Sequence, residues 1–249
     1  MPLPLSVPLC YGSSYPDLSD IKFGGSCFEF VGHSDGRGWF ATCRHVVDDC
    51  PEGHSPFICD ALETTNRDPK FYPILEVRPH PKVDFAALHI DFSDSDHRWN
   101  PEWRWFGPAP DDGLLDDVSA AGWVIETCGS GTHLLSRRLK GYVTRTIATP
   151  DYIPGAGDAC LEVSFPSVVG FSGAALVAPD HNSSTPPPER VVGMMFQNHR
   201  SRVDESLEHE FTDGRGMTER ERIASIVNFG LAHPVSVILS CLNDLGLGR

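Results

Sequence analysis

The stretch Gly170-Phe171-Ser172-Gly173-Ala174-Ala175-Leu176 places one serine between two glycines, with apolar residues on either side. Apolar segments flank it at 161–165 and 191–196, and short segments of this kind indicate β-strands. We therefore predict Ser172 on a tight loop between strands. Glycine on both sides lets the backbone turn the Gly170 and Ser172 amides toward one point, the geometry that stabilises an oxyanion. Taken alone, the stretch fits a glycine turn with an ordinary serine equally well.

Two upstream segments carry the residues that would activate such a serine. A serine hydroxyl is a weak nucleophile near neutral pH, so catalysis needs a histidine as base and a carboxylate that orients it. His45 follows the apolar segment 38–42, and Asp84 opens the apolar segment 83–88, where only a paired charge would be tolerated. His45, Asp84 and Ser172, in that order along the chain, form a candidate catalytic triad.

These segments resemble motifs of the chymotrypsin-like (trypsin-like) serine peptidases, and most closely those of the bacterial HtrA-like branch. Residues 42–47 are similar to the Thr-x-x-His-Val motif, 83–88 to the Asp-hydrophobic-Ala-x-Leu motif, and 170–173 to the Gly-x-Ser-Gly motif. Val192-Gly193 and 229–235 look like the family's closing strands. The resemblance implies the following roles: His45 as general base, Asp84 as its orienter, Ser172 as nucleophile, and the Gly170 and Ser172 amides as oxyanion hole.

The nucleophile motif departs from the family at Phe171. Secreted members carry an aspartate there, which pairs with a newly cleaved N-terminus, and HtrA-like members carry an asparagine. Activation by cleavage is therefore not implied for this chain. No cysteine directly follows His45, so the disulfide of secreted members cannot form in its usual place.

The resemblance also implies a pocket for the substrate side chain that precedes the scissile bond. Its residues in this chain would be Pro166, Met195, Phe196 and Gln197. None is anionic, and a basic substrate side chain needs a carboxylate to offset its desolvation. We therefore expect a preference for apolar residues over Arg or Lys, unless an acidic residue of the segment 197–228 folds back over the pocket.

The predicted fold class is all-β, with two six-stranded antiparallel β-barrels and a short C-terminal helix. We predict an N-terminal arm (1–20), a first barrel (21–98), a connector (99–114), and a second barrel with the helix (115–249), a division that suits 249 residues. Thr218-Glu219-Arg220-Glu221 has the capping-box pattern of a short helix. Three tryptophans around the connector would form either a belt against the barrels or an exposed recognition patch: Trp99, Trp103 and Trp105.

The amino-acid composition limits which partners and which cellular location we expect for this protein. With 34 acidic and 20 basic residues, the net charge of −14 disfavours nucleic acid and anionic membranes. The segment 1–9 has no basic residue and three prolines, unlike a signal peptide, and no segment is apolar enough for a membrane helix. We expect a cytoplasmic protein with reduced cysteines, since its eight cysteines form no compact framework.

One segment offers a competing metal site, because it concentrates cysteine and histidine: Cys43, His45, Cys50, His54 and Cys59. Zinc sites favour close ligand pairs such as Cys-x2-Cys, which this segment lacks. We therefore expect no metal and no cofactor.

The predicted function is a serine endopeptidase that acts on protein or peptide substrates. The alternatives are a catalytically silent binding module with the same fold and an esterase that uses the same site. A regulatory protein partner stays open.

Overall fold

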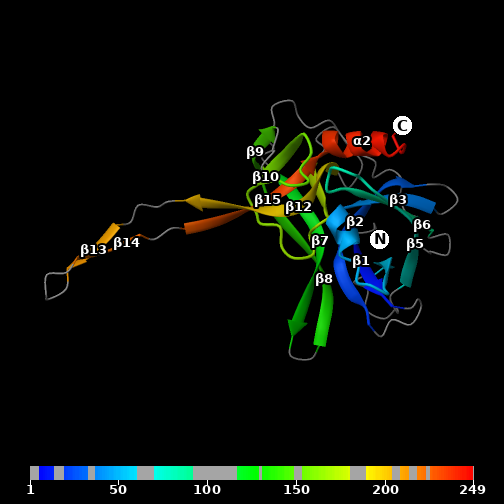
Figure 1. Ribbon diagram of the computed structural model, residues 1–249, viewed down its shortest axis with the longest axis horizontal. Helices are drawn as coiled ribbons and strands as arrows, with labels where there is room; N and C mark the ends of the chain where they lie inside the picture. The colour runs from blue at the N-terminus through cyan, green and yellow to red at the C-terminus, as the bar shows by residue number, and fades with distance from the viewer. Residues whose placement is uncertain are drawn as a thin grey trace.

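The structure is a computed structural model that describes residues 6–13, 20–32, 37–60, 70–91, 117–128, 131–148, 153–179, 189–203, 208–212, 218–222 and 225–248. It is built from antiparallel β-strands in two units, with a helix at the C-terminal end (Figure 1). The predicted all-β fold class with a short C-terminal helix is confirmed. The first unit is a six-stranded barrel as predicted, whereas the second is a seven-stranded sheet in place of the predicted second six-stranded barrel.

The first unit is a closed six-stranded barrel in the order β1-β2-β3-β6-β5-β4. One helical turn, α1 (Arg44–Asp48), follows β3. The strands of the barrel are β1 (Val7–Gly12), β2 (Lys22–Gly32), β3 (Arg37–Thr42), β4 (Ser55–Asp60), β5 (Lys70–Pro79) and β6 (Ala86–Asp91).

The second unit is a seven-stranded sheet in the order β8-β7-β11-β12-β15-β10-β9. Residues 164–174, which carry the predicted nucleophile Ser172 and are called the nucleophile loop below, lie between β10 and β11. The strands are β7 (Val118–Cys128), β8 (Gly131–Gly141), β9 (Val143–Ala148), β10 (Ala159–Val163), β11 (Ala175–Pro179), β12 (Glu189–Val203) and β15 (Ser225–Pro234).

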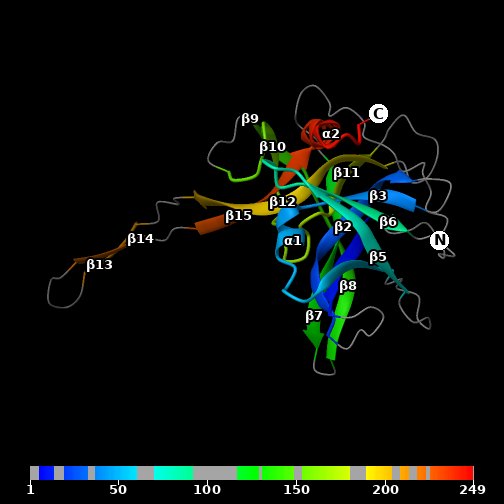
Figure 2. The same ribbon diagram turned by 45° about the vertical axis from the view of Figure 1, so that its right-hand side comes forward.

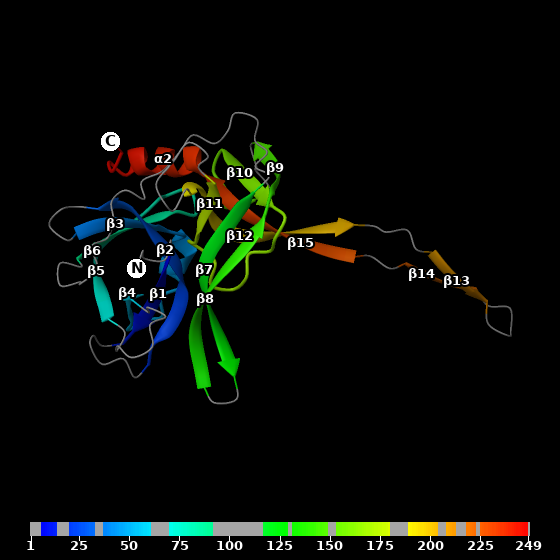
Figure 3. The same cartoon turned by 180° about the vertical axis from the view of Figure 1, so that it is seen from behind.

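Strands β12 and β15 continue beyond the sheet as a long hairpin. The two-stranded sheet of β13 (Glu208–Thr212) and β14 (Thr218–Arg222) lies at its far end, well away from both units (Figures 1 and 3). The prediction of a short helix at residues 218–221 is wrong, because this segment pairs with β13 along its whole length. Cross-strand pairing outweighs the local capping pattern there.

The N-terminal segment also differs from its prediction. Residues 7–12, expected within a surface arm, form strand β1, and all six are buried. This strand pairs with β2 and β4, for example Leu9 with Ile58. The sequence did not indicate this strand because it contains Pro8, and proline is rare within a sheet. The predicted connector (99–114) and its tryptophans lie outside the described residues, so the domain boundaries stay a prediction.

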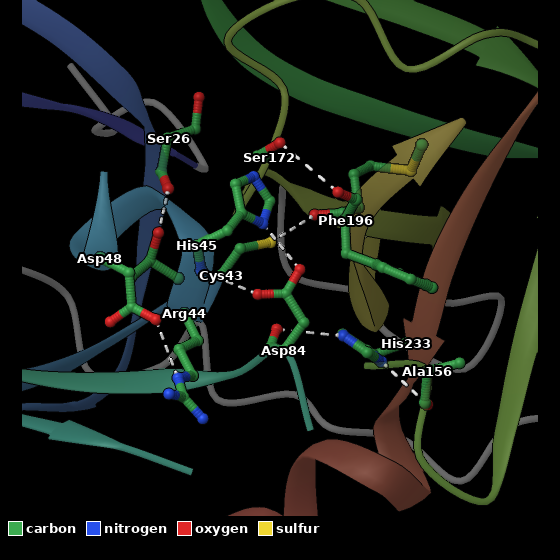
Figure 4. A network of polar contacts seen from close by, with 12 residues as sticks. Ser26, Cys43, Arg44, His45, Asp48, Asp84, Ala156, Ser172, Phe196 and His233 are labelled. Carbon is green, nitrogen blue, oxygen red and sulfur yellow. Dashed lines mark hydrogen bonds and ion pairs between the residues drawn. The ribbon is translucent and has the colours of Figure 1, made fainter. Parts of the chain in front are cut away.

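A shared core joins the two units. One cluster of buried side chains contains Leu9 and Phe85 of the first barrel together with Met194 and Phe196 of the second unit. Helix α2 (Val235–Asp244) follows β15 and returns toward the first barrel (Figures 1 and 2). There, Arg78 donates a hydrogen bond to the Leu245 carbonyl at 3.3 Å. His45 and Asp84 come from the first unit and Ser172 from the second, and the three lie near one another (Figure 4).

None of the helices within the described ranges has the length and apolar character needed to cross a bilayer.

Candidate active site

His45 lies on the single turn α1 and is fixed by both oxygens of one carboxylate. Its backbone amide donates to Asp84 Oδ1 at 2.9 Å, and its Nδ1 lies 2.7 Å from Asp84 Oδ2 (Figure 4). An ionised carboxylate only accepts hydrogen bonds, so Nδ1 carries the proton of this contact. In the neutral ring, Nε2 is then the free acceptor.

Asp84 is itself held by the second unit. Its amide donates to the Gly155 carbonyl at 2.8 Å, and its carbonyl accepts a hydrogen bond from His233 Nε2 at 3.1 Å. Gly155 has a φ of +76°, and a Cβ there would lie 2.7 Å from the Asp84 Cβ. The loop at 153–157 therefore packs directly on Asp84, with glycine required at the contact.

His233 is a buried second histidine that the sequence analysis did not single out. Its ring is stacked on Phe196, with centroids 4.1 Å apart, and its Nδ1 lies 3.3 Å from the Ala156 carbonyl oxygen. It is 0% exposed. The one indication in the sequence was that this histidine lies within the apolar segment before Pro234. That position indicates burial but does not reveal which residue the histidine contacts.

Asp84 and its two histidines have shifted pKa values. Burial lowers the pKa of His45, but the hydrogen bond and charge of Asp84 outweigh burial and raise it above its ordinary value. Burial raises the pKa of Asp84, yet its bonds from His45 bring it below the ordinary value. Burial lowers the pKa of His233 to about 4, although the Asp84 charge opposes this shift. His45 is thus the histidine that exchanges protons near neutral pH.

The loop that carries Ser172 has a tightly fixed backbone. Gly170 and Gly173 have φ values of +98° and +85°, and a Cβ at either position would overlap a carbonyl oxygen, that of Trp123 or Ser26. Phe171 is 0% exposed and packs in the core of the second unit. The residue that departs from the family motif therefore anchors the loop through apolar burial.

Figure 4 shows the His45 ring between Ser172 and Asp84. In this structure the Ser172 hydroxyl donates to the Phe196 carbonyl at 3.5 Å. At this distance the bond is weak, and rotation of the Ser172 side chain would release it.

The amides next to Ser172 fall into two groups. The Phe171, Gly173 and Ala174 amides donate to carbonyls of the protein at 2.8–2.9 Å. Among the described residues, no such acceptor is found for the Gly170 and Ser172 amides. These are the two amides predicted to form an oxyanion hole, and that role stays a prediction.

The five Cys and His residues weighed as an alternative metal site do not all come together in the described part of the chain. The Cys50 thiol contacts the His54 carbonyl at 3.5 Å, and Cys59 packs in a separate apolar cluster with Cys10. Within the described ranges, the one group of three donor atoms close enough for a metal is that of Cys43, His45 and Asp84. Two of these already bind each other.

The Cys43 thiol donates to the Met195 carbonyl at 3.2 Å. Burial and the charge of Asp84 raise its pKa well above the ordinary value, so the thiol keeps its proton. A protonated thiol is a poor metal ligand.

The residues expected to form the substrate pocket differ in burial. Met195 and Phe196 are buried, Gln197 is half-buried and Pro166 is exposed. A reciprocal pair of hydrogen bonds, each 2.6 Å long, joins the Asn198 side chain to the backbone of Ser167. The side chain of Asn198 thereby ties the segment that precedes the nucleophile to β12, a contact that the sequence analysis missed.

The fold and the residues at the junction of its two units define the class of protein: a two-unit, all-β protein with an Asp-His pair beside a loop serine (Figure 4). No protein family and no curated protein matches the sequence. Among solved structures, the chain is similar to one described as "Structure of GrC", at 14% sequence identity and a TM-score of 0.48, over 96% of this chain and 94% of that chain.

Proposed function

We propose that this protein is a serine endopeptidase. The observation that carries the proposal is the double contact of His45 with Asp84, which leaves His45 Nε2 as the free acceptor, with the ring between Asp84 and Ser172 (Figure 4). An oriented, neutral imidazole beside a serine on a glycine loop is the arrangement that activates a hydroxyl for acyl transfer.

The reaction would proceed in two halves. The Ser172 hydroxyl turns from the Phe196 carbonyl to His45 Nε2 and gives up its proton as Oγ attacks the substrate carbonyl carbon. The tetrahedral oxyanion accepts hydrogen bonds from the Gly170 and Ser172 amides. His45 then protonates the leaving amine, an acyl-enzyme remains on Ser172, and water activated by His45 hydrolyses it.

A catalytically silent binding module is the second candidate function. The observation in its favour is the Ser172 hydroxyl, which contacts the Phe196 carbonyl instead of His45. An esterase would use the same residues on an ester substrate. The resemblance to the HtrA-like branch, the cytoplasmic location and a regulatory partner stay predictions.

The first test is covalent labelling with a fluorophosphonate probe. We expect the probe to label the wild-type protein at Ser172, and Ser172→Ala to lose labelling together with roughly 10³-fold or more of kcat. Ser119→Ala is the matched control, because Ser119 is a buried serine that contacts Arg138 and lies outside the nucleophile loop. It should be labelled normally.

The same experiment separates the candidate functions. An unlabelled wild-type protein would contradict the proposal and support the binding module. Labelling at Ser172 with turnover of esters but of no peptide would identify an esterase instead.

The second prediction concerns the residue before the scissile bond. Pro166, Met195, Phe196 and Gln197 bring no carboxylate, and a desolvated basic side chain would be costly without one. We expect a peptide library to show cleavage after apolar residues favoured about tenfold or more over Arg and Lys. Efficient cleavage after Arg or Lys would mean that an acidic residue from elsewhere in the chain enters the pocket.

A further inference from the structure

Ser26 lies on β2 of the first barrel and contacts the nucleophile loop of the second unit. It is 0% exposed. Its amide donates to the Ser172 carbonyl at 2.9 Å, and its hydroxyl donates to the Gly170 carbonyl at 2.7 Å. One buried residue thus binds the loop on both sides of Phe171.

The remaining polar groups of Ser26 are also occupied. Its hydroxyl oxygen accepts a hydrogen bond from the Trp123 amide at 3.1 Å, and its carbonyl accepts one from the Thr42 hydroxyl at 2.8 Å. The hydroxyl is therefore oriented by Trp123 before it binds Gly170, and Thr42, which ends the strand before His45, holds the backbone of Ser26. Such a fully satisfied buried group is rigid and specific.

The two contacts with the loop fix peptide planes around the oxyanion-hole amides. A peptide unit is planar, so a bound carbonyl also fixes the orientation of the amide that follows it. The Gly170 carbonyl fixes the plane that follows Gly170, and the Ser172 carbonyl fixes the plane that follows Ser172. The Ser172 amide belongs to the single peptide between these two planes, and the Gly170 amide directly precedes them.

We propose that Ser26 is a positioning residue of the active site, which holds the Gly170 and Ser172 amides in the orientation that binds an oxyanion. The oxyanion hole would then be assembled by docking of the first barrel onto the second unit. The catalytic consequence rests on the proposed function, whereas the ordering of the loop does not.

The experiment compares Ser26→Ala with Ser119→Ala, two changes that each remove a buried serine hydroxyl. Direct loss of one oxyanion-hole donor costs about 10²–10³ in kcat, so we expect a smaller loss of roughly 10- to 100-fold for Ser26→Ala, with KM changed less than about threefold. Ser26→Cys, which keeps a weak donor on a somewhat larger atom, should recover part of this loss. Ser119→Ala should behave as wild type.

A second measurement does not depend on activity. Amide hydrogen exchange of the segment 168–176 should become about tenfold faster in Ser26→Ala and stay unchanged in Ser119→Ala. Faster exchange in this segment would support the loop contact even if the wild-type protein fails to react with the fluorophosphonate probe, a result that would contradict only the proposed function.

The inference is overturned if Ser26→Ala keeps both normal kcat and normal exchange. It is also overturned if its losses match those of Ser119→Ala, since these would reflect general destabilisation. Ser26→Gly removes the same hydroxyl, and it decides the question by the same two criteria if the alanine variant does not fold.

Discussion

The two histidines that contact Asp84 differ in almost every physical respect. His45 comes from the first barrel, contacts the carboxylate and has a side chain that is 41% exposed. His233 comes from the second unit, contacts the backbone carbonyl and is 0% exposed. The pKa of His45 is raised, and burial lowers that of His233 to about 4. Proximity to one aspartate therefore does not decide a histidine's charge: the atom contacted and the access to water decide it.

Removal of the Asp84 carboxylate should have the largest effect on activity, because it takes away the contact that distinguishes His45 from His233. We expect Asp84→Asn to lower kcat by roughly 10³–10⁴-fold, because the imidazole loses the acceptor that fixes its tautomer. The wild-type protein should lose activity as the pH falls through the raised pKa of His45, since a protonated histidine cannot act as base. In the variant, the group that raises this pKa is gone, so the acid limb of residual kcat/KM should move to lower pH.

A second His-Asp contact offers a matched control for this measurement. His80 Nε2 lies 3.2 Å from an Asp244 carboxylate oxygen, away from Ser172. We expect Asp244→Asn to keep the wild-type kcat and pH profile. Equal losses in Asp84→Asn and Asp244→Asn, or an acid limb in Asp84→Asn that does not move, would contradict the assigned role of Asp84.

Local motifs predicted the all-β fold class and the candidate triad, of which the structure shows the His45–Asp84 contact, while tertiary contacts determined most of the rest. His45, Asp84 and Ser172 each lie in a short sequence pattern. Each pattern indicates a chemical role without knowledge of the residues that it contacts in the fold. Ser26 and His233 acquire their contacts only when the units pack together, and their sequence neighbours do not reveal those contacts. Strand pairing also determined two segments whose local sequence indicated something else. Pro8 is unusual in a strand, yet β1 pairs within the barrel, and a capping pattern favoured a helix where β14 pairs with β13.

The prediction with the smallest effect concerns how the free energy of unfolding depends on the protonation of His233 and His45. A histidine with a pKa of about 4 in the folded protein and about 6.5 in the unfolded chain binds a proton on unfolding at intermediate pH. The free energy of unfolding should therefore fall as the pH drops from about 6.5 to 4, and His233 should account for about 2 kcal/mol of the loss between pH 7 and pH 5. His45 has the opposite sign: its raised pKa adds stability at low pH, which is lost as the pH rises through that value.

Urea unfolding of the wild-type protein and His233→Phe at pH 7 and pH 5 measures this contribution. Phenylalanine keeps an aromatic ring for the stack on Phe196 and cannot be protonated, while His45 and Asp84 titrate in both proteins. The wild-type protein should lose about 2 kcal/mol more than the variant between the two pH values. Equal losses would mean that folding does not shift the pKa of His233, and a smaller loss in the wild-type protein than in the variant would mean that His233 is already charged in the folded protein. Both of its ring nitrogens face carbonyl oxygens, those of Asp84 and Ala156, and only an imidazolium donates to both at once. That outcome would place a positive charge beneath Asp84 and remove the contrast between the two histidines.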